Sequence, residues 1–224
     1  MNLEYELENI KNQFKQKAPQ EVQDLFALAT KELEIQNLSE NALKEEDTIP
    51  NGNLLDIHSK EVELYEYFKE SDFIVLNFYR GGWCPYCNLE LKAFQEIIPQ
   101  LEKLNAKLIA ISPQLPDLSL STKEKNALEF EVLSDLQNKI AKKFGLVFSV
   151  DERVRPIYKE FGIDLPSSNA DQSYEIPFPA TYVVNKEYKI IYSFINEDHT
   201  KRAEPLEILK YIKNEAIKNE KNNI

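Results

Sequence analysis

Hydrophobic residues in the first part of this chain recur with the spacing of amphipathic helices. Over residues 1–45 they return every three or four positions, which places them on one face of a helix. One stripe comprises Leu3, Leu7, Ile10 and Phe14, and a second comprises Val22, Leu25, Phe26, Ala29 and Leu33. Pro19 separates the two stripes as a helix breaker. We predict two N-terminal helices over 1–45, either a cap on the main domain or a dimerisation arm.

The pattern changes to that of alternating strands and helices after a polar link. Residues 53–64 alternate around a turn and predict a hairpin, and the apolar run Phe73–Tyr79 is typical of a strand buried on both faces. Further strands are expected at 106–112, 130–135, 180–185 and 189–195. Further helices are expected after Cys84 with a bend near Pro99, near 121–128, at 138–145, at 155–161 and from Pro205 onward.

This order predicts one α/β domain over residues 46–224, preceded by the helical extension. Strands that alternate with helices favour a mainly parallel sheet with helices on both faces. The last two strands are separated by a tight polar turn, so we expect them to pair antiparallel at one side of the sheet. The turn-rich stretch around the helix at 155–161 is expected to continue as an exposed loop.

Composition narrows the class of protein. The 224 residues are 42% hydrophobic and 29% charged, which describes a globular chain, and no apolar run is long enough to span a bilayer. A formal net charge of -11 argues against nucleic acid as a partner. The N-terminus lacks the pattern of a secretory signal, and two cysteines in so long a chain fit a reducing compartment. We expect a cytoplasmic protein.

The segment "GGWCPYC", residues 81–87, contains both cysteines of the chain. It lies between a buried strand and a helix, so Cys84 and Cys87 should sit at a helix N-terminus, where the macrodipole lowers a thiol pKa. Pro85 and Tyr86 separate the two sulfurs, and Pro85 suits a first helical turn. A Cys-x-x-Cys pair in this setting indicates redox chemistry.

Other interpretations of these residues carry less weight. A zinc site needs four ligands, and His58 and His199 are isolated, so we predict neither a metal nor a bound cofactor. Two inert buried thiols are a further alternative. Trp83 is expected to shield the pair. Arg80 either helps to hold a thiolate or is a solvated strand end, and Glu90 either orients a nearby base or caps a turn.

Several segments resemble one known family. "FYRGGWCPYCNLELKAFQ", "AISPQ", "VLSDLQNKIAKKFGLVF" and "IPFPATYVVNKEYKI" together resemble the peroxiredoxin-like proteins of the alkyl hydroperoxide reductase/thiol-specific antioxidant (AhpC/TSA) group. The resemblance spans about residues 46–212. It implies a thioredoxin-like, peroxiredoxin-type fold and peroxidase activity.

The family's active-site pattern is only partly kept. Laid on "RGGWCPYC", the family's peroxide-oxidised Cys falls on Cys87, its Thr on Cys84 and its Pro on Arg80, while its active-site Arg falls on Pro179. The replacements resemble thioredoxin, in which Trp-Cys-x-x-Cys faces a cis-proline. Pro179 resembles that proline, although most X-Pro bonds are trans.

Two mechanisms follow, with a third alternative. In a peroxidase, the Cys87 thiolate attacks the peroxide and Cys84 resolves the sulfenic acid, and thioredoxin or another thiol donor reduces the disulfide. In a disulfide reductase, Cys84, expected to be the more exposed thiol, attacks a substrate disulfide and Cys87 resolves. A non-catalytic binding protein is the third. The resemblance also suggests a homodimer.

Overall fold

The structure, a computed structural model, describes residues 1–222. The helices are α1 (Leu3–Lys17), α2 (Gln20–Gln36), α3 (Pro85–Gln95), α4 (Ile98–Glu102), α5 (Pro116–Lys125), α6 (Lys139–Lys143), α7 (Arg155–Glu160), α8 (Leu165–Asn169) and α9 (Pro205–Asn222). The strands are β1 (Asn53–Leu55), β2 (Glu61–Glu63), β3 (Phe73–Phe78), β4 (Ala106–Ser112), β5 (Glu131–Ser134), β6 (Val147–Ser149), β7 (Glu175–Pro177), β8 (Ala180–Asn185) and β9 (Ile190–Ile195). Three short 3-10 helices lie at Leu38–Asn41, Leu64–Glu70 and Leu136–Asn138.

The central sheet has seven strands in the order β2-β1-β5-β4-β3-β8-β9. Only the neighbouring pairs β3–β4 and β4–β5 are parallel, whereas β1 pairs antiparallel with β5 and β8 pairs antiparallel with β3. The sheet is therefore mixed, and the prediction of a mainly parallel sheet was wrong. The predicted hairpin β1–β2 and the antiparallel pair β8–β9 are both present.

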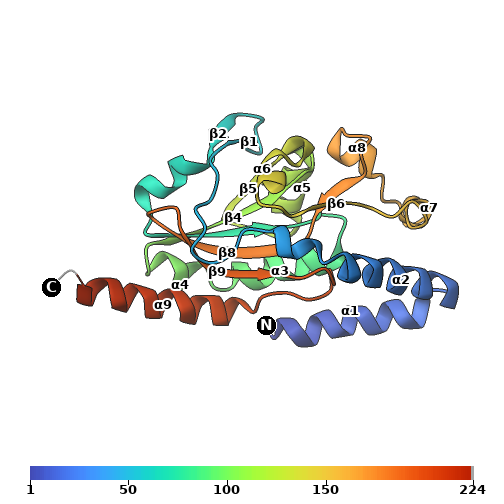
Figure 1. Ribbon diagram of the computed structural model, residues 1–224, viewed down its shortest axis with the longest axis horizontal. Helices are drawn as coiled ribbons and strands as arrows, with labels where there is room; N and C mark the ends of the chain where they lie inside the picture. Colours follow the sequence, from blue (N-terminus) through green and yellow to red (C-terminus); the bar gives the residue numbers. More distant parts are fainter. Residues whose placement is uncertain (223–224) are drawn as a thin grey trace.

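Strand β3 divides the core into two layers. All six of its residues are buried, and successive side chains point to opposite faces of the sheet. Phe73 and Val75 join a cluster with side chains of α1, α3, α4 and α9, whereas Ile74, Leu76 and Phe78 join another with side chains of α6. Figure 1 shows α1 and α9 along the same side of the sheet. Helices cover both faces, as the sequence predicts.

Three features differ from the expectations. Helix α5 begins at Pro116, several residues before the predicted start, because proline is favoured in the first helical turn. The expected loop after α7 contains helix α8, whose N-cap Asp164 accepts a hydrogen bond from the amide of Ser167. Strands β6 and β7 pair antiparallel as a separate small sheet that the sequence analysis missed. Each strand has three residues, too few to show a period.

The two N-terminal helices pack differently. Helix α1 lies against α3, and its Leu3 and Leu7 are buried in the same cluster as the two cysteines. Helix α2 has no fully buried residue and rests Leu25, Phe26 and Ala29 on a third cluster, which includes Tyr158 of α7. The extension therefore covers the region of the motif. None of the helices in residues 1–222 combines the length and the apolar character that a membrane span requires.

Candidate active site

The dithiol motif connects the end of β3 to the start of α3. Cys84 is the N-cap residue of α3, and Cys87 lies in the first turn, with Pro85 at the start of the helix. Both cysteines are free thiols. This is the position at a helix N-terminus that the sequence predicts, where amide groups without helical partners favour a negative charge.

Polar side chains hold the loop before α3 in place. The amide of Gly82 donates to Oε1 of Gln114 at 2.6 Å. Nδ2 of Asn88 donates to the carbonyls of Gly82 at 2.8 Å and Cys84 at 3.1 Å. Gly81 has a φ of +151°, and a Cβ there would collide with the indole of Trp83. The loop is therefore fixed by side chains from β4–α5 and α3.

Both thiols are buried. Cys84 is 1% exposed and Cys87 is 0% exposed, so neither sulfur is open to solvent, and Cys84 is the more exposed thiol only in that it lines a cavity. The reason is the surrounding cluster, in which Tyr86 and residues of α1 pack around the pair. A reactant must reach the dithiol through a cavity.

A buried ion pair lies directly against Cys87. Arg202, which precedes α9, donates through Nε to Oε2 of Glu90 at 2.7 Å and through Nη2 to Sγ of Cys87 at 3.3 Å. The side chains of Arg202 and Glu90 are each 1% exposed. Arg202 also donates to the backbone carbonyls of His199 and Lys201. Glu90 thus orients an arginine that contacts the sulfur, rather than capping a turn.

The carboxylate of Glu90 continues into a polar network across the sheet. Its Oε1 accepts from the hydroxyl of Thr181 at 3.4 Å, and that hydroxyl accepts from Nδ2 of Asn77 at 3.1 Å. Burial raises the pKa of Glu90 to about 7, although the charge of Arg202 opposes the rise. Glu90 therefore carries its full negative charge only above neutral pH.

Arg80 is also buried, at 4% exposure, and is not a solvated strand end. One of its terminal nitrogens donates to the hydroxyl of Tyr158, and the guanidinium lies 5.0 Å from the centre of the Trp83 ring. Its Nε has no hydrogen-bond partner within residues 1–222. Ion pairs link Arg153, Arg155 and Arg202 to carboxylates, but Arg80 has none in the described part of the chain.

The two thiols differ in acidity. Burial opposes ionisation of Cys84, but hydrogen bonding to the Cys87 thiol and the positive charges of Arg80 and Arg202 lower the pKa of Cys84 to about 6. Burial and the neighbouring Cys84 raise the pKa of Cys87 well above its ordinary value. The pair therefore holds one negative charge at neutral pH, because the second ionisation would place two anions side by side.

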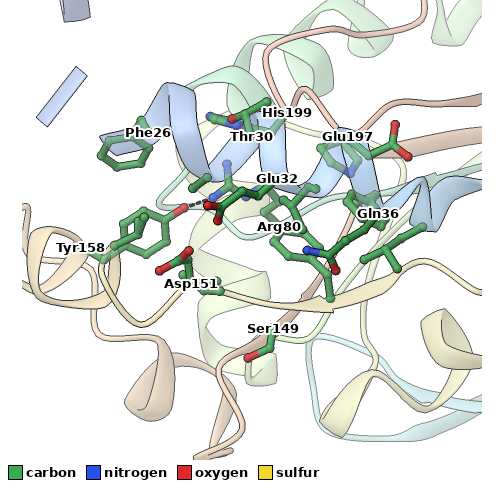
Figure 2. A pocket seen from close by; sticks show the side chains of 18 residues that line it. Phe26, Thr30, Glu32, Gln36, Arg80, Ser149, Asp151, Tyr158, Glu197 and His199 are labelled. Carbon is green, nitrogen blue, oxygen red and sulfur yellow. Dashed lines mark hydrogen bonds between the residues drawn. The ribbon is translucent and has the colours of Figure 1, made fainter. Parts of the chain in front are cut away.

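Two cavities meet at Arg80. The larger, which we call the dithiol groove, has a volume of about 650 Å³ and is lined by Trp83, Cys84, Pro85, Tyr86 and Arg80 on one side and by α1 and α2 on the other. The smaller, of about 250 Å³, is lined by Arg80, Tyr158 and Pro179. Figure 2 shows this smaller cavity, with the hydrogen bond between Tyr158 and Arg80.

Pro179 and His199 both line the smaller cavity. The peptide bond before Pro179 is trans, unlike that of the proline it resembles. His199 lines both cavities and meets the ring of Tyr86 edge-on. Burial, together with the charges of Arg80 and Arg202, keeps the pKa of His199 well below its usual value, so the imidazole is neutral. The sequence gives no indication of a role for His199.

The structure brings most of the predicted site residues together, and it adds Arg202, Gln114 and Asn88. Arg202 opens the segment "RAEPLEIL", but nothing in its local pattern marks it as a partner of Cys87. Within residues 1–222, no group of three or more His, Cys, Asp or Glu side chains could hold a metal ion.

A helix-capping Cys-x-x-Cys pair beside a sheet with helices on both faces defines a thioredoxin-like thiol oxidoreductase. Residues 46–193 match the model of the AhpC/TSA family, and the chain belongs to this family. It is therefore an oxidoreductase, a thiol peroxidase or a thiol-disulfide oxidoreductase.

Proteins similar to this chain include both peroxiredoxins and thiol-disulfide oxidoreductases. Peroxiredoxin Bcp of Bacillus subtilis is 28% identical over 164 residues, which are 72% of this chain and 91% of that protein. Thiol-disulfide oxidoreductase ResA of Bacillus thuringiensis is 24% identical over 164 residues, 73% of this chain and 75% of that protein. The crystal structure of peroxidoxin BcpB from Mycobacterium tuberculosis superposes with a TM-score of 0.62 at 19% identity, over 76% of this chain and 97% of that one.

Proposed function

We propose that this protein is a thiol-dependent peroxidase that reduces hydrogen peroxide or organic hydroperoxides through the Cys84/Cys87 dithiol. The observation that carries the proposal is the guanidinium of Arg202, held by Glu90 and hydrogen-bonded to Sγ of Cys87. A fixed cation at this sulfur supports a thiolate there. It also supports the negative charge that develops on the departing oxygen of a peroxide. Arg202 thus supplies a cation at the sulfur although Pro179 occupies the position of the family's active-site arginine.

The cycle balances with an external thiol donor. A Cys87 thiolate, formed when the Cys87 proton passes to the Cys84 thiolate, attacks one oxygen of the peroxide, so that an S–O bond forms, the O–O bond breaks, and the alcohol or water leaves after taking up a proton. Cys84 then attacks the sulfenic sulfur of Cys87, which forms the disulfide and releases water. Two thiol groups of a donor, thioredoxin or another thiol, return the two electrons.

A second function is favoured by a different observation. Cys84 lines the dithiol groove and has the lowered pKa, whereas the pKa of Cys87 is raised. These are the properties of an attacking thiol and a resolving thiol in disulfide exchange. In this alternative the protein is a thiol-disulfide oxidoreductase, in which Cys84 attacks a substrate disulfide and Cys87 releases the product.

Stopped-flow oxidation of the reduced protein separates the two functions. Trp83, the single tryptophan, reports on the site, and mass spectrometry identifies the product. For a peroxidase we expect rapid oxidation at stoichiometric peroxide, and a Cys84→Ser variant that consumes one equivalent and stops at a sulfenic acid on Cys87. Oxidation no faster than that of a free thiol, with a Cys87→Ser variant that traps a mixed disulfide on Cys84, would establish disulfide exchange instead.

Location and assembly are further parts of the proposal. A dithiol that cycles through a disulfide needs a compartment that returns it to the reduced state, so we place the protein in the cytoplasm. Pairing of two chains through the extension is supported by the exposed side chains of Tyr5, Leu28 and Ile35. Sedimentation of the full chain tests this, and a monomer at micromolar concentration would rule it out.

A further inference from the structure

The wall of the dithiol groove is a feature of the extension. Helices α1 and α2 supply one side of the groove, and both precede residue 46, where the family match begins. Phe14, Phe26, Phe161 and Ile163 give the groove an apolar lining. Of the two thiols, Cys84 is the one on its wall. Whatever compound occupies the groove therefore meets Cys84 first.

The extension also limits the size of that compound. Phe26 of α2 stacks on Tyr158 at 5.9 Å between ring centres and meets Phe14 of α1 edge-on at 5.6 Å. These contacts hold the two helices beside Cys84, which is 1% exposed. A folded protein cannot bring a cysteine to this sulfur unless α2 moves, whereas a compound of a few hundred daltons fits a cavity of about 650 Å³.

The charged residues that line the groove indicate which charge a bound compound should carry. Among the residues that line the groove, Lys11, Lys15 and Lys31 are balanced by the three carboxylates of Asp24, Glu34 and Asp198, so these groups favour neither sign of charge. Where the groove meets the smaller cavity lies Arg80, buried and without a carboxylate partner in the described residues. A buried cation is normally paired, because an unpaired charge is costly away from water. The groove thus offers a site for an anion beside Cys84.

We propose that the dithiol groove binds a low-molecular-weight thiol that carries a carboxylate, and that this thiol reduces the Cys84–Cys87 disulfide with its carboxylate on Arg80. The proposal rests on the dithiol cycle of the proposed function and names the donor that completes it. In the alternative function, the same compound in its disulfide form would be the substrate, because it also meets Cys84.

The reaction needs two molecules of the thiol. The thiolate of the first attacks Sγ of Cys84, so that a mixed disulfide forms and Cys87 leaves as a thiolate beside Arg202. The thiolate of a second molecule attacks the sulfur of the first, which releases a small disulfide and leaves Cys84 reduced. Two electrons pass to the protein, and the protons of the two small thiols pass to the dithiol or to water.

Glutathione and its diethyl ester are the probes, since they differ in their carboxylates and share the same body and thiol. The full chain is oxidised with diamide, and the reduction rate, expressed per thiolate, is followed by Trp83 fluorescence. Glutathione should react about tenfold or more faster than the ester, the worth of one hydrogen-bonded ion contact. Reduced thioredoxin at the same concentration should react more slowly than glutathione.

Variants of single residues test whether Arg80 causes the faster reaction with glutathione. In Arg80→Gln, the ratio of the reduction rate with glutathione to that with the ester should fall to near one. Arg155→Gln is the control, because it removes a guanidinium that stacks on Tyr174 away from the groove, and it should leave the ratio unchanged. Phe26→Ala should raise the rate with thioredoxin by loosening α2. S-methylglutathione, which cannot react, should protect Cys84 of the wild-type protein from a neutral alkylating agent, and this test needs no variant.

The inference is overturned if glutathione and its ester react at equal rates, if S-methylglutathione gives no protection, or if thioredoxin is the faster donor. It is also overturned if Arg80→Gln keeps the preference. The assay uses no peroxide, so a protein that fails to reduce peroxide still gives an answer here. Conversely, a rapid peroxidase that prefers thioredoxin would contradict only this inference.

Discussion

Two buried arginines surround the dithiol, and they do so in different ways. Arg202 is neutralised by Glu90 and reaches Cys87 with a remaining N–H group. Arg80 contacts aromatic rings and a tyrosine hydroxyl, and it interacts electrostatically with the dithiol. Arg202 is therefore a fixed positioning group. The charge of Arg80, in contrast, is offset only when Cys84 is ionised.

Replacing Arg202 by Met should lower both stability and reactivity. Above neutral pH, where Glu90 is ionised, removal of Arg202 leaves this carboxylate buried and unpaired, which costs about 3–5 kcal/mol in free energy of unfolding. Oxidation of Cys87 by peroxide should also slow, because its sulfur loses the donor at 3.3 Å. Urea unfolding and stopped-flow oxidation measure the two effects.

The double variant Arg202→Met/Glu90→Gln is the control for this prediction. It contains no buried carboxylate at this position, so its stability should return toward that of the wild-type protein while its oxidation stays slow. Recovery of the peroxide rate in the double variant would show that Arg202 acts only through folding. A stability loss below about 1 kcal/mol in the single variant would contradict the ion pair's burial.

Sequence could identify the thiols but not their partners. Cys84 and Cys87 lie in one short motif, whose position between a strand and a helix follows from local patterns. Arg202 is 115 residues from Cys87 and is brought to it only by the packing of the segment before α9 on the sheet. Glu90 was identified as a neighbour on the same helix, but its function became clear only with Arg202.

At the level of elements, α1 and α2 contribute differently to the molecule. Helix α1 inserts Leu3 and Leu7 into the cluster that contains the cysteines, whereas α2 touches the domain with half-buried side chains. Helix α1 is therefore part of the core, and α2 is the more easily displaced wall of the groove. Stability and access to Cys84 are divided between the two helices.

Leu3→Ala should destabilise the protein by about 2–5 kcal/mol, the usual cost of removing a fully buried leucine side chain. Leu28→Ala on α2 is the matched control, since Leu28 is 44% exposed and its loss should change stability by less than about 0.5 kcal/mol. Thermal or urea unfolding compares the two. Equal losses would mean that α1 is not part of the core.

Elements with a clear period were predictable, and those fixed by caps or by pairing were not. β3 and the hairpin β1–β2 follow from their patterns. The start of α5 depends on Pro116, and α8 depends on the cap at Asp164, signals of a single residue each. The antiparallel pairing of β1 with β5 at a single pair, Leu55 with Ser134, leaves no trace in the alternation of side chains.

For the molecule as a whole, the site is a nearly neutral group of buried charges. Arg80 and Arg202 are positive, and Cys84 and Glu90 supply the negative charges. The balance depends on pH because both acids titrate within the ordinary range. Folding stability should therefore vary with pH in a way that can be assigned to these groups.

The reduced protein should become more stable relative to Cys84→Ser as pH rises from about 6 to 9. In this window the folded state has released the Cys84 proton, whose pKa is about 6, while the unfolded chain, with a pKa of 9.0, still holds it. Unfolding then takes up a proton, so raising the pH disfavours it.

Glu90 has the opposite effect between pH 4.5 and about 7, because its folded pKa is raised and unfolding releases a proton. Urea unfolding of the reduced protein and of Cys84→Ser across this range separates the two groups. Parallel curves for the two proteins above pH 6 would contradict a lowered pKa for Cys84.

The single shared charge of the dithiol also sets how many protons accompany its two electrons. Above the pKa of Cys84, near 6, reduction of the disulfide gives one thiolate and one thiol, so it takes up two electrons and one proton. The midpoint potential should then fall by about 30 mV per pH unit, half the slope expected when both sulfurs are protonated. The protein would thus keep its oxidising strength in alkaline surroundings better than an ordinary dithiol of the same potential at low pH.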